Sequence, residues 1–414
     1  MKLKRTTRSF LVSIVGLLVS PAWAQFPSNP TFTTRALTPF AIEGLTADAT
    51  GNLYTTGRQP DTNKKCPVWR IDSSGARRTV AFIANNPACN PSGIAFDAVG
   101  NLYIADAAGG GRVWRVKPHP VGCASDDSST PACNAVPDAT AFAVNAPGTN
   151  GLAFDRFGSL WTGDGTTGRG RVWRISGPNA DCATSVNCEE VFRIQPMRNG
   201  TALGGDISSV QLAAEPAQGV GRQARTFPHT AANGNPQDLV ANGLAFNPDG
   251  DLFIADTARG AIWKVEFNND GSVAGGQIGC DTTFTPNTVC LDTVFVAHPL
   301  LEGTDGIALD TAGNIWNSAN ERNAIVVVTP QKQAIEIFRN APDGTTGLRN
   351  QGPLEFPTSP FLIGTTFCTA NSDGNRRDNF PNSGGEASPS GPSRGKISCM
   401  DQALSSPGLP LPVE

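Results

Sequence analysis

Charged residues and histidine are both scarce in this 414-residue chain, and each shortage narrows what the protein can be. Charged residues make up only 16% of the sequence, while 45 glycines and 32 prolines are spread through it, which argues against a coiled coil or a helical bundle. The formal net charge of −4 offers no basic surface, so we expect no nucleic-acid binding. Low charge with 7% aromatic residues also disfavours global disorder. The composition favours short strands joined by tight turns.

Metal and catalytic signatures built on histidine or cysteine are also weak. The three histidines, His119, His229 and His298, are far apart in the sequence, and only His229 falls in a long insertion. No two of the ten cysteines stand in a C-x-x-C arrangement, so they do not predict a zinc site. We expect His119 to be exposed to solvent. A histidine-based catalytic centre therefore has little support.

The first 24 residues predict an export signal. Basic residues from Lys2 to Arg8 precede an apolar stretch at 10–19, and a small-x-small cleavage site ends at Ala24. The apolar stretch is short for a membrane anchor, which is the alternative. No later segment is apolar for 18 residues, so we expect no membrane contact after cleavage and a periplasmic or extracellular location. Cysteines in such an oxidising compartment are expected to pair.

One template is repeated along the chain. Each copy has a glycine, an alternating apolar strand, a turn and a second alternating strand. The five copies are Gly44-LTADATGNLY, Gly93-IAFDAVGNLY, Gly151-LAFDRFGSLW, Gly243-LAFNPDGDLF and Gly306-IALDTAGNIW. A third and a fourth strand can be read after each copy, for example RVWRV at 112–116 and ATAFAV at 139–144. Four antiparallel strands per repeat are the unit of a β-propeller blade.

A sixth, weaker copy begins at Phe361 and continues to GKISC at 395–399, but its fourth strand is missing. Residues 31–35, near the start of the mature chain, offer that strand. The sequence therefore predicts an all-β, six-bladed propeller of four antiparallel strands per blade, closed by the N-terminal strand. We expect a signal peptide at 1–24, the propeller at 25–400 and a C-terminal tail at 401–414. An open solenoid is the alternative.

Each repeat carries an acidic residue in its first turn, and the simplest interpretation is hairpin chemistry. We assign these residues no catalytic role: Asp48, Asp97, Asp155, Asp249 and Asp310. Three aspartates that end second strands, Asp106, Asp164 and Asp256, could line a pocket but are more simply turn residues. The long insertions at 195–238, 340–357 and 372–394 are expected around one mouth of the central channel, where long loops are often functional.

The residue before each template glycine is expected to point at that same channel mouth. Around the ring this position is occupied by Glu43, Ser92, Asn150, Asn242, Asp305, and Thr358 or Ser359. Two carboxylates and two amides form a set of hard oxygen donors, which suits Ca²⁺ better than Zn²⁺, although another divalent cation remains open. An Asx turn or a strand cap is the alternative for each residue.

These repeats resemble NHL-type propellers and the senescence marker protein/gluconolactonase family, over about residues 31–400. Related propellers similar to diisopropyl fluorophosphatase hold a catalytic calcium with one Glu, two Asn and one Asp in that chain order. Glu43, Asn150, Asn242 and Asp305 match the order, and the resemblance implies that Asp305 is the catalytic base or nucleophile. In gluconolactonase-like relatives the Glu lies in Glu-Gly-Pro, whereas this chain has Leu45 after Gly44.

Two functions are compatible with these observations. The first is an exported calcium-dependent hydrolase of a small-molecule lactone or related ester. The second is a non-catalytic NHL-type propeller that binds a protein or glycan, with any metal structural.

The positions of the cysteines in the repeats further predict the disulfides Cys66–Cys89, Cys123–Cys133, Cys182–Cys188, Cys280–Cys290 and Cys368–Cys399.

Overall fold

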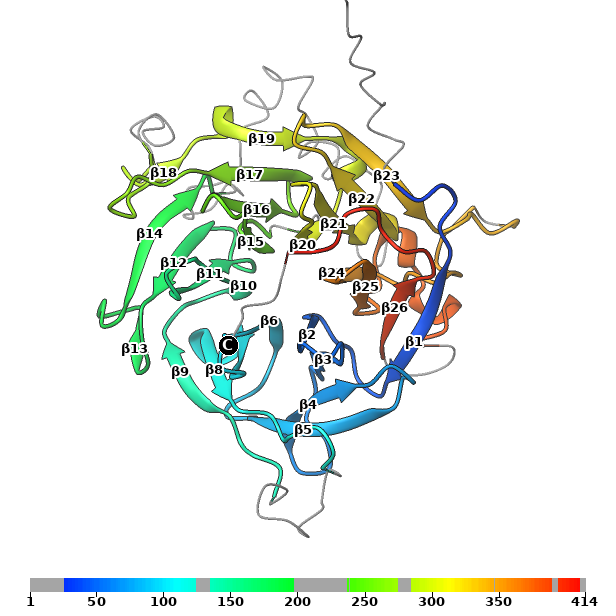
Figure 1. The fold of residues 1–414 in the computed structure, drawn as a ribbon, viewed down its shortest axis with the longest axis horizontal. Helices are drawn as coiled ribbons and strands as arrows, with labels where there is room; N and C mark the ends of the chain where they lie inside the picture. The colour runs from blue at the N-terminus through cyan, green and yellow to red at the C-terminus, as the bar shows by residue number, and fades with distance from the viewer. Residues whose placement is uncertain are drawn as a thin grey trace, which may run out of the picture.

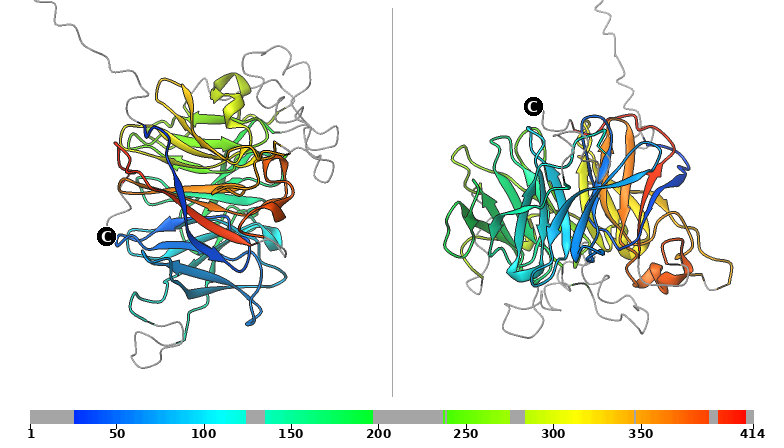
Figure 2. Two further views of the ribbon diagram at one scale, coloured as in Figure 1. Left: turned by 90° about the vertical axis from the view of Figure 1, so that its right-hand side faces the viewer. Right: turned by 90° about the horizontal axis from the view of Figure 1, so that it is seen from below.

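The structure is a computed structural model that describes residues 26–123, 135–196, 237, 239–274, 284–345, 347–388 and 394–409. These residues form six sheets of four or five strands, placed side by side around a central axis (Figure 1). The predicted six-bladed propeller is confirmed. In the side views of Figure 2 the N-terminal strand, in blue, lies beside the last strand, in red.

Blades one to three come from the N-terminal half of the described chain. Blade one contains β2 (Thr46–Ala47), β3 (Leu53–Thr56), β4 (Lys65–Ile71) and β5 (Arg77–Ala84). Blade two contains β6 (Pro91–Phe96), β7 (Leu102–Asp106), β8 (Arg112–Val116), β9 (Thr140–Val144) and the short β13 (Ala180–Asp181). Blade three contains β10 (Thr149–Phe154), β11 (Leu160–Asp164), β12 (Arg171–Ile175), β14 (Cys188–Ile194) and the short β18 (Thr288–Val289).

Blades four to six complete the ring. Blade four contains β15 (Leu244–Phe246), β16 (Leu252–Asp256), β17 (Ala261–Val265) and β19 (Val294–Ala297). Blade five contains β20 (Thr304–Leu309), β21 (Ile315–Ala319), β22 (Ala324–Val328) and β23 (Ala334–Arg339). Blade six contains β24 (Pro357–Ile363), β25 (Thr366–Asn371), β26 (Gly395–Met400) and β1 (Phe32–Thr38). Short 3-10 helices lie in the connections at Ala108–Gly110, Leu291–Thr293, Pro299–Leu301, Asn320–Arg322 (η7), Arg377–Asn379 and Asn382–Gly384.

The N-terminal strand closes the ring, as the missing fourth strand predicted. Strand β1 pairs antiparallel with β26, from Phe32 opposite Met400 to Thr38 opposite Gly395. Thr31 continues the contact by donating its hydroxyl to Asp401, 2.6 Å away. Closure joins residues more than 350 positions apart in one sheet and gives blade six its fourth strand.

Loops between third and fourth strands reach across to the preceding blade, a feature that the repeat pattern did not predict. The loop of blade three supplies β13, which runs parallel to β9, and the loop of blade four supplies β18, which runs parallel to β14. Phe82 and Asp138 form a similar bridge between blades one and two. These additions pair the outer edges of three blades, which are otherwise open.

The first turns of blades one, two, three and five use their Asp as predicted, and the assignment in blade four needs a correction. Asp310 shows the pattern: one oxygen accepts from the backbone of Ala312 and Asn314, and the other from Trp316 Nε1 at 3.0 Å. In blade four this position is held by Asn247, which accepts from the backbone of Asp251. Our assignment of Asp249 to that turn was wrong, because Asp249 lies two residues further along.

Three of the five predicted disulfides are confirmed: Cys66–Cys89, Cys182–Cys188 and Cys368–Cys399. Cys123 and Cys290 are also disulfide-bonded, but their expected partners at 133 and 280 lie outside the described residues. Cys66 lies within strand β4. No helix among the described residues is long and apolar enough to span a bilayer.

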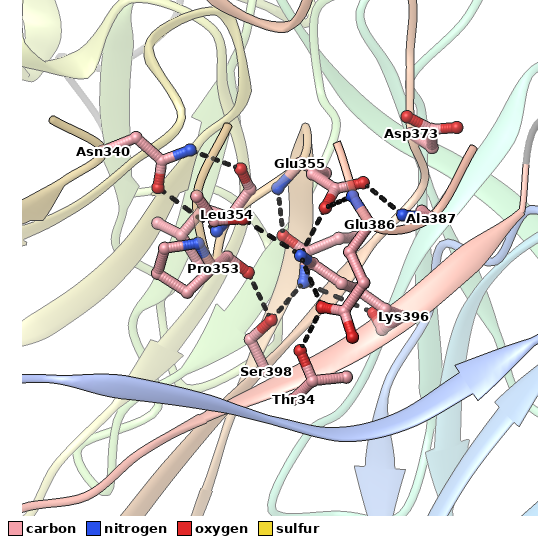
Figure 3. A network of polar contacts seen from close by, with 12 residues as sticks. Thr34, Asn340, Pro353, Leu354, Glu355, Asp373, Glu386, Ala387, Lys396 and Ser398 are labelled. Carbon is pink, nitrogen blue, oxygen red and sulfur yellow. Dashed lines mark hydrogen bonds and ion pairs between the residues drawn. The ribbon is translucent and has the colours of Figure 1, made fainter. Parts of the chain in front are cut away.

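A buried ion pair holds together the insertions of blade six (Figure 3). Lys396 and Glu355 have fully buried side chains, and Lys396 Nζ lies 2.5 Å from Glu355 Oε1. Glu355 also accepts from the backbone of Glu386 and Ala387 at 2.7 and 2.8 Å. Glu386 in turn accepts from Thr34 of the closing strand at 2.7 Å. The described parts of 340–357 and 372–394 are therefore fastened to the last blade.

Candidate functional site

The residues before the template glycines form a closed circle, which we call the first ring. A Cβ atom added to each glycine would meet the backbone oxygen of the next blade's ring residue at 2.1–2.6 Å, so only glycine allows this approach. The successive contacts are Gly44 on Ser92, Gly93 on Asn150, Gly151 on Asn242, Gly243 on Asp305 and Gly306 on Thr358. Thr358 Oγ1 then donates to the carbonyl of Glu43 at 2.8 Å and closes the circle.

The strand register settles which residue of blade six belongs to the first ring. Pro357 pairs with Asn371 just as Thr304 pairs with Ala319 in blade five. Thr358 therefore corresponds to Asp305, and Ser359 corresponds to Gly306. All six members of the first ring are buried, with exposed fractions between 2% and 8%.

Three of the four predicted ligands lie near one another. Asp305 is close enough to Glu43 for their charges to interact, and the side chain of Asn242 lies within hydrogen-bonding reach of the Asp305 carboxyl. The fourth, Asn150, lies at the same level of the ring through the contact of its carbonyl with Gly93. The structure thus places the two carboxylates and one amide together, with the second amide on the same circle.

Burial raises the pKa of the Asp305 carboxyl well above its ordinary value, and the negative charge of Glu43 raises it further. Hydrogen bonds from Asn320 and Asn242 and the charge of Arg58 act in the opposite direction without cancelling this effect. Additional positive charge near Asp305 would favour the ionised form of its carboxyl. A cation placed in the ring would supply it.

A second ring of residues supports the first, and our sequence analysis missed it. It consists of the residue two positions after β3, Arg58, and of the residue directly after the second strand in the other five blades, at Ala107, Gly165, Thr257, Asn320 and Ser372. Four members contact the first-ring residue of their own blade. Reading this position around the repeats, as was done for the first ring, would have identified these residues.

Each of these four contacts positions a predicted ligand. Arg58 Nη1 lies 2.6 Å from Glu43 Oε2, and Asn320 Nδ2 donates to Asp305 Oδ2 at 2.9 Å. Thr257 accepts from Asn242 Nδ2 at 2.9 Å, which turns the amide oxygen of Asn242 away from Thr257. In blade three the position is Gly165, where a Cβ would lie 2.5 Å from the Cβ of Asn150.

Below the first ring, the central channel contains a mostly apolar cavity of about 300 Å³. First strands from all six blades line it with residues such as Leu45, Phe154 and Phe246, and Leu409 of the C-terminal tail borders it. Leu409 is held there by a backbone hydrogen bond to Leu309. The polar ring and this apolar cavity form one continuous axial feature, since the template glycines 93, 151, 243 and 306 line the cavity as well.

Histidine takes no part in the first or second ring. His119 is buried, with an exposed fraction of 6%, so our expectation of exposure was wrong; its backbone N–H and C=O bond to Val80 and Arg70. His298 Nδ1 accepts from the backbone of Leu300 at 3.1 Å, and burial lowers its pKa. His229 lies outside the described residues.

The aspartates that end second strands are structural, in line with the simpler interpretation. Asp106 and Asp256 accept from the indole nitrogens of Trp114 and Trp263, at 2.9 and 3.0 Å.

Residues 391–395 spell G-x-S-x-G, the signature of a strand-to-helix elbow in serine hydrolases. Here it leads into strand β26, so it does not have the context that the elbow requires.

The donor chemistry of the first ring fits a hard divalent cation. It offers carboxylate and amide oxygens in a buried setting, with no nitrogen or sulfur ligand, as Ca²⁺ prefers. The described residues contain no group of three or more His, Cys, Asp or Glu side chains suited to a metal. Any cation would therefore depend on the amide oxygens as well as on the two carboxylates.

Comparison with known families gives a partial match. Residues 214–349 match the family described as the SMP-30/gluconolactonase/LRE-like region. The match covers about one third of the chain and includes Asn242 and Asp305, but not Glu43 or Asn150. No curated protein matches the chain by sequence.

Solved structures of similar fold cover nearly the whole chain. A luciferin-regenerating enzyme matches with a TM-score of 0.54 and 13% identity, over 93% of this chain and 99% of its own. Regucalcin from Agrobacterium tumefaciens, a calcium-binding protein, matches with a TM-score of 0.50 and 16% identity, over 92% and 97%. A protein assigned as a gluconolactonase gives 0.50 and 15%, over 95% and 98%. At these identities the likeness shows the shared propeller fold.

Proposed function

We propose that the chain is an exported, calcium-dependent hydrolase of a lactone or related ester. The observation that carries the proposal is the buried first ring, in which burial and the charge of Glu43 raise the pKa of Asp305 beside the amide of Asn242. The partial match to the gluconolactonase-like family and the fold shared with a calcium-binding protein support it. Disulfides in the structure are compatible with export.

In this proposal Glu43, Asn150, Asn242 and Asp305 hold the ion. When bound, the ion would polarise the ester carbonyl and lower the pKa of a nearby water. Arg58 and Asn320 hold the carboxylates of Glu43 and Asp305 in place. Water adds to the carbonyl carbon, the ester C–O bond breaks, and a lactone yields its hydroxy acid.

In that reaction Asp305 acts either as a base that accepts a proton or as a nucleophile that bonds to the acyl group. As a base it would take the proton of the attacking water through the carboxylate oxygen not bonded to Asn320. As a nucleophile it would form an acyl intermediate at that oxygen. A single turnover in ¹⁸O-labelled water separates the two roles, because only the nucleophile incorporates label into Asp305.

Calcium titration of the mature, disulfide-intact protein by calorimetry, with Mg²⁺ and Zn²⁺ in parallel, tests the metal. Hydrolysis of simple γ- and δ-lactones with and without Ca²⁺ tests the chemistry. The matched control is Ser92→Ala, a first-ring substitution in blade two that removes no predicted ligand. We expect one calcium per chain and loss of hydrolysis on chelation. No binding of any divalent cation would refute the proposal and favour the propeller that binds a protein or glycan.

A further inference from the structure

Arg58 is the charged member of the second ring. The other five members, Ala107, Gly165, Thr257, Asn320 and Ser372, are uncharged. Its partner is also unusual among the arginines near this face. Arg259, for example, pairs with Asp256, which is not a first-ring residue, at 2.6 Å. Arg58 instead pairs with Glu43, one of the two first-ring carboxylates.

The position of the Arg58 guanidinium is set by several bonds. Its Nε and Nη2 both donate to Asn90 Oδ1, at 2.9 and 2.5 Å, while Nη1 lies 2.6 Å from Glu43. Asn90 is itself held by a backbone hydrogen bond to Asp106 at 2.8 Å. These contacts use three of the five N–H groups of a planar guanidinium. The other two have no hydrogen-bond partner among the described residues, and 29% of the side chain is exposed.

When the first ring holds a divalent cation, the formal charges of the two rings indicate which charge a bound molecule should have. A divalent cation held by Glu43 and Asp305 cancels the two carboxylate charges. Glu43 can contact the ion through Oε1 while Oε2 stays on Arg58, so the guanidinium does not have to leave. The charge of Arg58 is then unbalanced within the two rings, at a partly buried position where charge-assisted hydrogen bonds are strong.

We propose that Arg58 is a specificity-determining residue that selects substrates with a carboxylate next to the scissile ester. This inference rests on the proposed function, because it requires the cation that neutralises Glu43 and Asp305. The planar guanidinium matches a carboxylate better than it matches a neutral hydroxyl or amide. A neutral lactone would leave the charge of Arg58 without a partner at the mouth.

The test uses a pair of probes of nearly equal shape, 5-oxotetrahydrofuran-2-carboxylate and its carboxamide. Binding is measured with unreactive analogues that lack the ring carbonyl, tetrahydrofuran-2-carboxylate and its carboxamide, by calorimetry on the calcium-loaded protein. A charge-assisted hydrogen bond contributes about 1.5–3 kcal/mol, so we expect the carboxylate to bind about 10- to 100-fold more tightly. Hydrolysis of the two lactones should show the same preference in kcat/KM.

Arg58→Met should abolish this preference, and Arg58→Lys should retain part of it, because Lys keeps the charge but cannot form the fork on Asn90. The matched control is Arg112→Met, which replaces an arginine at the start of the third strand of blade two that packs on Trp114; it should keep the full preference. Arg58→Met should still bind one calcium per chain in calorimetry, because all four predicted ligands are unchanged.

The outcomes separate this inference from the proposed function. Calcium binding without preference for the carboxylate, or a preference that survives in Arg58→Met, overturns the role of Arg58 and leaves the calcium site intact. Absence of calcium binding in the wild type overturns the proposed function and this inference with it. Absence of a carboxylate preference in the wild type overturns the role of Arg58 even if the Arg58 variants do not fold.

Discussion

Replacing Lys396 with Met should destabilise the protein far more than any other change of a single lysine to Met. The Lys396 side chain is fully buried and bonds to Glu355 at 2.5 Å and to the carbonyl of Gly352 at 3.1 Å (Figure 3). Met keeps most of the aliphatic stem but removes the charge, which leaves the Glu355 carboxylate buried without its cation. Removing one partner of a buried pair costs about 3–5 kcal/mol.

Two backbone N–H donors to Glu355 determine how large the loss of free energy of unfolding should be within the range for a broken buried pair. The N–H groups of Glu386 and Ala387 still donate to Glu355 after the substitution, so part of the carboxylate remains satisfied. We therefore expect a loss of about 3 kcal/mol in the free energy of unfolding. The double variant Lys396→Met/Glu355→Gln removes both charges and should recover at least about 1 kcal/mol of it.

The assay is urea unfolding of the disulfide-intact protein followed by tryptophan fluorescence, with midpoint and slope compared among variants. Lys264→Met is the matched control, because Lys264 pairs with Asp251 at 2.9 Å while 28% of its side chain is exposed. A partly exposed pair of this kind contributes about 0–1 kcal/mol. Equal losses for Lys396→Met and Lys264→Met would show that the buried pair does not fasten the blade-six insertions, and our reasoning would be wrong.

Three further predictions concern the rings and the same insertion. Asp305→Asn should keep the free energy of unfolding within about 1 kcal/mol of the wild type yet abolish hydrolysis; residual activity above about one percent would contradict its role. Glu43→Gln should weaken calcium binding by about tenfold or more in calorimetry, because one ligand charge is lost; an unchanged Kd would remove Glu43 from the ligand set. Burial, and secondarily the charge of Glu355, raises the pKa of Asp373 to about 6 from 3.8. The folded state then binds the proton more tightly than the unfolded state, so stability from this group is complete below about pH 4 and is lost as pH rises to about 6. Relative to Asp373→Asn, the wild type should lose about 1–2 kcal/mol over that interval, and parallel pH profiles would refute the assignment.

The amino-acid sequence alone determined the architecture of this protein. Alternating apolar strands and turn residues such as Asp48 and Asp310 act within a few positions, so their pattern can be read without knowing the fold. The same pattern recurs in each copy of the template, which made the blades recognisable. The missing fourth strand of the sixth copy indicated closure by the N-terminal strand. The same register predicted that Glu43, Asn150, Asn242 and Asp305 share one ring position.

Tertiary structure decided which side chains meet, because the ring joins residues that no local rule connects. The charge of Glu43 acts on Asp305 although the two are far apart in the sequence, and only closure of the propeller brings them together. Arg58 and Asn90 come from adjacent blades, and Lys396 of strand β26 pairs with Glu355 because the insertion at 340–357 folds over blade six. His119 was assigned to solvent from its loop position, yet packing buried it. Burial and pairing depend on how neighbouring blades pack, and so they are properties of the closed ring and not of the repeat.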